Sequence, residues 1–411
     1  MGTADKNGTS VYDYSSTQQG WLFSAVAIGS LVGTVPIAEL FTVYGMRKVT
    51  TIYGLISATA TLLSPIAASQ GFYWLFAMRV LQGFALTVTF PATGSVTANW
   101  ASLKESGTYL AVLSVYLQAA PIFTMPVAGA FCVSPIGWTG VYYLQGSLTV
   151  VFFALFYCFY RDTPRMHKTV SVKELFKIEN GKSVTSSISK RIPYLAICKD
   201  ITIIAVWIAN IGASAAFQIF LQYGPTYLNK VLNYEISKTG FATAFPFVLA
   251  LILKLVAGPF SDYATCISER SRLITFTIAS QGTMALCFIV LAQIPTSQAF
   301  AGWVAYALSI AFSGLNCVGL FKCAQMVSRQ YFPFVMAVMS FFNSLTILYL
   351  PPVVFLMAPN NLPEEWATLF YIVCGVVLVS NAFFCFVCKS EPAAWTSDCP
   401  IEPEKKDIEK F

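Results

Sequence analysis

Long runs of apolar residues alternate with short polar joints along most of this chain. Each run has roughly 20 residues, the length at which an α-helix crosses the hydrocarbon core of a bilayer. Joints such as Ala68-Ser69-Gln70-Gly71 separate neighbours, as expected where helices turn back at a membrane surface. Eleven runs are found, at 20–42, 49–69, 72–93, 107–129, 138–160, 199–222, 239–259, 273–294, 299–321, 333–357 and 367–388. The pattern predicts an all-α membrane protein with about 11 transmembrane helices.

Composition supports this class. Hydrophobic residues make up 56% of the 411 residues and charged residues only 11%, and 34 residues are phenylalanine. A soluble domain carries about 25% charged residues. The alternating ten-residue segments of a transmembrane barrel are not visible. Membrane lipid is therefore an expected partner, and the formal net charge of +6 needs no nucleic acid to explain it.

The positions of lysine and arginine predict the orientation of the chain, because cationic loops stay on the cytoplasmic side during insertion. One set of loops, which includes residues 161–198 and the tail from Lys389, holds 20 of the 25 cationic residues. The opposite set holds three, and the other two, Arg79 and Lys254, lie inside runs. The C-terminus is therefore expected in the cytosol. Asn7 begins an Asn-Gly-Thr glycosylation acceptor on the opposite, lumenal or extracellular, side.

A basic, serine-rich segment divides the runs into five and six. Such a long central loop is typical of secondary transporters built from repeated bundles, with the solute site between the halves near the membrane midplane. We therefore expect a lumenal or extracellular segment (1–19), an N-terminal bundle (20–160), a cytosolic linker (161–198), a C-terminal bundle (199–388) and a cytosolic tail (389–411).

Two motifs resemble those of the major facilitator superfamily. Gly258-x-x-x-Asp262, followed by Arg270, resembles its cytoplasmic-loop motif, and the turn that contains Arg47 is a weak echo in the first half. Arg79-x-x-x-Gly83 resembles a fourth-helix motif of the same superfamily. The resemblance implies two helical bundles that rock about a central site, with Gly258, Asp262, Arg270 and Arg47 in the gating loops.

Further stretches resemble the anion/cation symporter family of vesicular glutamate transporters, sialin and sodium-phosphate cotransporters. They are RVLQGFALTVTFPA (79–92), NWASLKESG (99–107), MPVAG (125–129), GPTYL (224–228), EISKTG (235–240) and LPEEW (362–366). That family has twelve helices and a glycosylated loop between the first two. The runs here then correspond to helices two through twelve, which predicts that the first helix is absent and that Asn7 lies in the glycosylated loop.

Arg79 is the most informative residue of the sequence. A guanidinium facing lipid costs several kcal/mol, so it should point into the bundle or into a wet cavity, where it is either a hydrogen-bonding hub or an anion ligand. The resemblance favours the anion ligand. It also implies departures, because Leu86, Phe23 and Ala213 stand where glutamate transporters carry an acid, a histidine and a second cation. Glutamate as solute and proton coupling through that acid are therefore disfavoured.

Other polar residues within the runs are weaker candidates for the solute site. Gln82, Tyr116, Asn210, Gln218 and Asn316 fit either a polar cavity wall or simple interhelical hydrogen bonding. Lys254 lies about five residues from the cytosolic end of its run, so we expect it to snorkel to the interface.

The sequence contains few of the residues and motifs that enzymes use for catalysis. His167, the only histidine, lies in the linker, which excludes a histidine-based metal site or catalytic triad in the membrane. No Walker loop is present, so we expect no enzyme, no metal and no cofactor.

The function that fits best is a secondary active transporter that moves an organic or inorganic anion by alternating access. The partner is a small anionic solute, with Na+ or H+, or the membrane potential alone, as driving force. The expected location is the plasma membrane or a vesicle or lysosome membrane. The alternative is a non-transporting membrane protein, a sensor or an inactive product, that keeps the fold.

Overall fold

The structure is a computed structural model that describes residues 14–102, 105–180, 192–232, 236–263 and 267–396. The ordered elements in these ranges are helices. The α-helices are α1 (Ser16–Tyr44), α2 (Met46–Gln70), α3 (Phe72–Leu86), α4 (Thr89–Trp100), α5 (Ser106–Leu113), α6 (Tyr116–Val133), α7 (Thr139–Phe159), α8 (Val172–Glu179), α9 (Tyr194–Lys199), α10 (Ile201–Thr226), α11 (Ile236–Tyr263), α12 (Glu269–Thr277), α13 (Thr283–Gln293), α14 (Ala299–Ser313), α15 (Lys322–Ser328), α16 (Phe332–Met357) and α17 (Pro363–Val387). A short π-helical segment at Ile278–Gly282 (η3) continues α12 into α13. Another at Cys317–Phe321 (η5) lies between α14 and α15.

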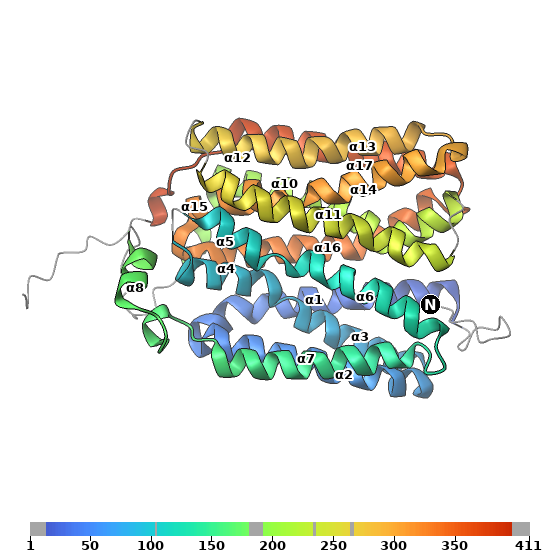
Figure 1. Cartoon of the computed structure of the whole chain (residues 1–411), viewed down its shortest axis with the longest axis horizontal. Coiled ribbons are helices and arrows are strands. Elements are labelled where there is room, and N and C mark those ends of the chain that lie inside the picture. The colour runs from blue at the N-terminus through green and yellow to red at the C-terminus, as the bar shows by residue number, and fades with distance from the viewer. Residues whose placement is uncertain (1–13, 103–104, 181–191, 233–235, 264–266, 397–411) are drawn as a thin grey trace, which may run out of the picture.

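The helices fall in the apolar runs predicted from the sequence. Ten helical stretches of the described chain are long and apolar enough to cross a membrane. One of them, Ala299–Met357, has 59 residues and contains both the ninth and the tenth predicted runs. The backbone breaks within it at Arg329, whose φ is 43°, and α14 and α16 on either side of the break are separate helices (Figure 1). This stretch therefore crosses twice, which agrees with the predicted eleven helices.

In the first bundle, two of the crossings consist of a pair of shorter helices. The break between α3 and α4 falls at Thr87 and Val88. Pro91 explains it, because a proline has no N–H to donate to the carbonyl four residues earlier, which belongs to Thr87. The break between α5 and α6 falls at Ser114 and Val115. Both breaks lie beside the central cavity described below.

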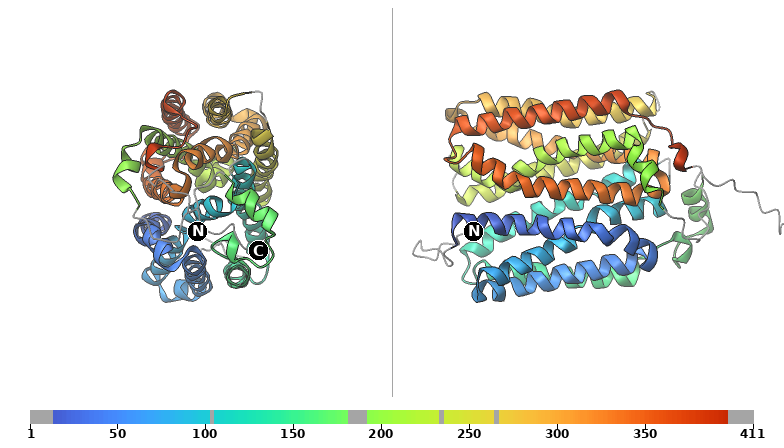
Figure 2. Two further views of the ribbon diagram at one scale, coloured as in Figure 1. Left: turned by 90° about the vertical axis from the view of Figure 1, so that its left-hand side faces the viewer. Right: turned by 180° about the vertical axis from the view of Figure 1, so that it is seen from behind.

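The helices form two bundles. Helices α1 to α7 lie on one side of the molecule and α10 to α17 on the other, with their axes roughly aligned (Figures 1 and 2). The bundles meet where α16 packs on α1 and α4, and where α11 packs on α5 and α6. The described chain starts at one end of this assembly, called here the N-terminal end. Helix α8 lies beyond the opposite end, called here the linker end (Figure 1).

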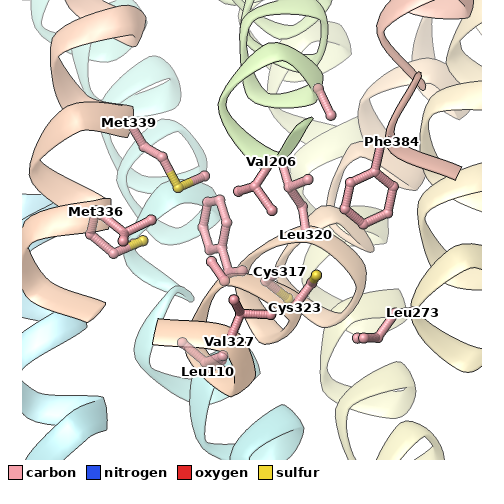
Figure 3. Close-up of a cluster of buried hydrophobic side chains, with 14 of the residues drawn as sticks. Leu110, Val206, Leu273, Cys317, Leu320, Cys323, Val327, Met336, Met339 and Phe384 are labelled. Carbon is pink, nitrogen blue, oxygen red and sulfur yellow. The ribbon is translucent and has the colours of Figure 1, made fainter. Parts of the chain in front are cut away.

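A buried apolar cluster joins the bundles toward the linker end. Leu110 of α5 packs there with Val206 of α10, Leu320 of η5, Met336 of α16 and Phe384 of α17 (Figure 3). By contrast, apolar side chains in the middle of outer helices, such as Phe152 of α7 and Val379 of α17, are more than half exposed. A lipid environment accounts for them, because a row of this kind would be unfavourable in water.

The linker contacts the first bundle. Lys177 of α8 forms an ion pair with Glu105, the residue that precedes α5, at 2.8 Å. The hydrogen bond and the charge of Glu105 raise the pKa of Lys177. Residues 181–191, the tail beyond residue 396 and the predicted glycosylation site Asn7 lie outside the described residues.

Glycines allow α1 and α3 to pack at backbone contact. A Cβ on Gly83 would collide with the Val26 carbonyl oxygen, and one on Gly29 would collide with that of Val80. We expect Gly83→Ala to lower the apparent melting temperature in detergent, because overpacking costs about 1–3 kcal/mol and backbone atoms cannot move aside. Gly375→Ala on α17, where a Cβ meets nothing within 4 Å, is the control and should not lower it. Equal melting temperatures for the two variants would contradict this packing.

Candidate solute cavity between the bundles

A cavity of about 580 Å³ lies between the two bundles. Its volume falls in the range of about 300–1,000 Å³ that small-molecule sites occupy. Side chains from both halves line it: α1, α3, α4 and α6 contribute from the first bundle, and α10, α11, α14, η5 and α16 from the second. A site shared in this way changes its exposure when the bundles move relative to each other.

Lys254 of α11 faces this cavity. Its side chain is 2% exposed, and its ammonium donates to Gln118 Oε1 at 2.6 Å and to the Ser114 carbonyl oxygen at 3.1 Å. The Ser114 carbonyl belongs to the break between α5 and α6, where the negative end of the α5 dipole favours a cation. The prediction that Lys254 snorkels to the interface is therefore wrong. The side chain turns inward because the helix break in the opposite bundle offers it acceptors.

The cavity has an unbalanced charge. Lys254 is the only charged side chain among the described residues that line it, and both of its hydrogen-bond acceptors are neutral. An ammonium has three N–H donors, and the contacts with Ser114 and Gln118 use two of them. A buried cation without a counter-ion is costly, and an anion that enters the cavity would offset that cost.

Four of the predicted solute-binding residues line the cavity: Tyr116, Asn210, Gln218 and Asn316. On the wall formed by the second bundle, Gln218 donates to Asn343 Oδ1 at 3.1 Å, and Asn210 donates to the Met339 carbonyl oxygen at 3.4 Å. Gln281 of η3 donates to Asn316 Oδ1 at 3.4 Å. These contacts make a wall of neutral amides opposite the first bundle.

Arg79 and Gln82 are not among the described residues that line the cavity. Arg79 Nη2 donates to the Tyr142 hydroxyl of α7 at 2.7 Å, and its guanidinium lies 5.8 Å from the centre of that ring. Gln82 contacts Arg79 at 3.4 Å and donates to hydroxyls of α2, on Thr61 and Ser64. The two residues thus belong to a polar network within the first bundle.

The predicted gating motif joins the bundles at the linker end. Asp262, at the end of α11, accepts from the backbone N–H groups of Gly107 and Thr108 at the start of α5, at 3.1 and 2.7 Å. It also forms an ion pair with Lys322 Nζ at 2.7 Å, and both side chains are nearly fully buried. Gly258 lies one turn earlier, where a Cβ would stand 2.8 Å from that of Ala111. We call this arrangement of Asp262, Lys322 and the α5 N-terminus the latch.

The sequence did not indicate Lys322 as the partner of Asp262. Lys322 lies between the ninth and tenth predicted runs, whereas the structure continues the helix through it as α15 and buries it. Arg270, the basic residue of the motif, instead donates to the Phe386 carbonyl oxygen at 3.4 Å and is exposed. Arg47 belongs to a separate contact in the first bundle, where its backbone N–H donates to Asp162 and its side chain to the Tyr157 carbonyl oxygen.

The cavity extends toward the N-terminal end. Its lining includes Phe23, near the start of α1, and Leu86, and these side chains are 43% and 49% exposed. The latch and the apolar cluster at Leu110 close the linker end. The structure therefore shows a conformation whose central cavity is sealed from the linker end.

The chain belongs to the major facilitator superfamily, whose sequence profile matches residues 9–351. The structure of the proton:xylose symporter XylE bound to 6-bromo-6-deoxy-D-glucose has the same fold, with a TM-score of 0.72, 13% sequence identity, and coverage of 92% of this chain and 89% of XylE. The protein is therefore an integral, multi-pass membrane protein of a transporter family, and not an enzyme.

Relatives within the superfamily confirm the resemblance to the anion/cation symporter group. Human sialin is 24% identical over 393 residues, which cover 93% of this chain and 78% of sialin. Human vesicular glutamate transporter 2 is 24% identical over 362 residues, 87% of this chain and 61% of that protein. Human sodium-dependent phosphate transport protein 1 is 23% identical over 397 residues, 94% of this chain and 84% of that protein.

Proposed function

We propose that this protein moves a small anion across its membrane, with Lys254 as the contact that recognises the negative charge. The single observation that carries the proposal is the buried ammonium of Lys254, which faces the central cavity without a carboxylate partner among the described lining residues. Two relatives are named for phosphate and glutamate, which are both anions, and this supports the same class of solute.

Lys254 also connects solute binding to the motion of the bundles. The residue belongs to α11, whereas its acceptors, Ser114 and Gln118, belong to the opposite bundle. A solute anion competes with these neutral acceptors, because a charge-assisted hydrogen bond is roughly twice as strong as a neutral one. Binding therefore weakens one tie between the bundles and favours their rearrangement around the solute.

The driving force follows from the charges that move. With one cation in the cavity, loading a monoanion makes the site neutral, and the membrane potential then acts on the return of the positively charged empty site. Sodium is the second candidate, because one relative is named as sodium-dependent. A proton route through residue 86 is disfavoured, because Leu86 has no titratable group.

Uptake into liposomes that contain the purified full chain tests the proposal. The panel consists of labelled phosphate, sialate, glutamate, urate, aspartate and benzoate, each under separate sodium, proton and voltage gradients. We expect saturable uptake of at least one anion. No uptake of any anion by folded protein would favour the alternative of a non-transporting protein that keeps the fold.

Arg79 is assigned a supporting role in the first bundle, because its contacts tie α3 to α7 and lie outside the cavity lining. We expect Tyr142→Phe to lower the melting temperature in detergent, because a hydrogen bond to a charged group contributes about 1.5–3 kcal/mol. The KM for the transported anion should change less than about threefold. A large rise in KM at unchanged stability would instead place Arg79 in the solute site.

A further inference from the structure

The charges and walls of the cavity narrow the class of anion. We propose that the solute is an organic monoanion with a single carboxylate or sulfonate, an apolar and preferably aromatic body, and no ammonium group. This inference rests on the proposed function, because it assumes that Lys254 contacts the solute. It goes further by excluding amino acids, dianions and small inorganic anions as preferred solutes.

The number of cations limits the solute to one negative charge. Lys254 is the single cationic side chain among the described lining residues. A monoanion makes the occupied cavity neutral, whereas a dianion leaves one negative charge without a partner in a site closed from the linker end. A charge that leaves water without a partner is strongly unfavourable.

The lack of carboxylates disfavours amino acids. An α-ammonium group needs an acidic or carbonyl partner when it leaves water. No aspartate or glutamate is present among the described residues around the cavity, and Leu86 stands at its exposed side. Neutral amide oxygens are the remaining acceptors, and those of Gln218 and Asn343 already accept hydrogen bonds, from Gln222 and from Gln218. An amide oxygen compensates the charge of an ammonium less well than a carboxylate does.

Much of the remaining wall is apolar, and its apolar side chains come from both bundles. Aromatic and aliphatic side chains that line the cavity include Phe23, Phe90, Phe217, Leu221, Phe321 and Ile347. Phosphate or sulfate would fill little of a cavity of about 580 Å³ and would leave these apolar side chains uncovered. A body with a ring buries apolar surface against them, which contributes about 25 cal/mol per Å².

A matched set of probes separates these features. The probes are 3-phenylpropanoate, phenylalanine, benzylmalonate and acetate, and inorganic phosphate is titrated separately as a test of the anion site alone. Phenylalanine adds an ammonium to the first compound, benzylmalonate adds a second carboxylate, and acetate lacks the ring. Each is titrated against the purified protein in detergent, and the shift of the melting temperature reports binding without the need for transport.

We expect 3-phenylpropanoate to raise the melting temperature of the wild type and to leave that of Lys254→Met unchanged. The other three probes should need at least about tenfold higher concentrations, because each leaves a buried charge unpaired or an apolar wall uncovered. Equal or better stabilisation by phenylalanine, benzylmalonate or acetate would overturn the class. Stabilisation by phosphate alone, if it depends on Lys254, would overturn the class and leave the proposed anion site intact. If no anion stabilises the protein through Lys254, the result contradicts both the proposed class of solute and the proposed function.

A variant that adds a negative charge to the cavity wall tests the same limit of one negative charge. Leu86→Glu adds a carboxylate at a lining position that is half exposed and therefore tolerates it. We expect at least about tenfold weaker binding of 3-phenylpropanoate, whereas the matched Leu86→Gln should bind nearly as well as the wild type. Equal binding by the two variants would contradict the proposed placement of the solute.

Discussion

Lys254→Met is expected to reduce anion uptake by about 30-fold or more, because truncating one partner of a buried charged contact costs about 2–5 kcal/mol. Methionine keeps the length and apolar stem of lysine but removes the charge. The measurement is the initial rate of uptake of the best anion of the panel into proteoliposomes, as kcat/KM. Lys254→Arg keeps the charge and should retain part of the activity, although a guanidinium is larger than an ammonium.

The stability of the same variant separates transport from folding. Lys254 is buried with neutral acceptors alone, so replacement by a well-packed apolar side chain should leave the melting temperature equal or higher. Loss of uptake together with a marked fall in the melting temperature would indicate that Lys254 acts as a structural tie, and would contradict its assignment as the anion contact.

Asp262→Asn is expected to open the linker end. The substitution leaves Lys322 buried without its counter-ion, and breaking a buried pair by removing one partner costs about 3–5 kcal/mol. A conformation in which α5 and α11 separate restores water to Lys322, so the equilibrium should shift toward it. The reporter is Ala111→Cys, at a position fully buried beside Gly258. Its reaction with a membrane-impermeant maleimide, followed at that residue by mass spectrometry, should become much faster.

Two controls accompany this variant. Arg270→Gln removes an exposed cation that contacts the Phe386 carbonyl and should leave the labelling rate unchanged. Lys322→Met added to Asp262→Asn removes the unpaired charge and should restore part of the protection. Faster labelling in Arg270→Gln than in Asp262→Asn would contradict the latch, because it would show that Arg270, and not the pair of Asp262 and Lys322, holds the linker end closed.

The sequence predicts the fold well because few backbone structures can cross a membrane. Each apolar run must form a helix that satisfies its own backbone, so the eleven runs and the central linker translate directly into crossings. The breaks in the helices at Thr87 and Ser114 are harder to predict from the sequence. Pro91 indicates the first, whereas the second has no proline at the required spacing.

The lining of the candidate cavity was predicted in part. Asn210 and Gln218, which are eight residues apart on one helix, do face the cavity, because polar side chains in a membrane bundle turn away from lipid. Lys254 was misjudged, since its distance from the interface permits snorkelling and only the three-dimensional contact with Gln118 shows that it points inward. Arg79 is not among the described lining residues, and it donates a hydrogen bond to Tyr142, 63 residues away, a partner that no local pattern reveals.

Locating a bound anion tests the central claim most directly. The measurement is an experimental structure of the full chain with a brominated form of the best transported anion, in which the bromine and the acidic group can be placed. The account predicts the acidic group within hydrogen-bond distance of Lys254 Nζ, about 3 Å, between α11 and the break that separates α5 from α6. An acidic group bound at Arg79, with Lys254 still bonded to Gln118 and Ser114, would contradict it.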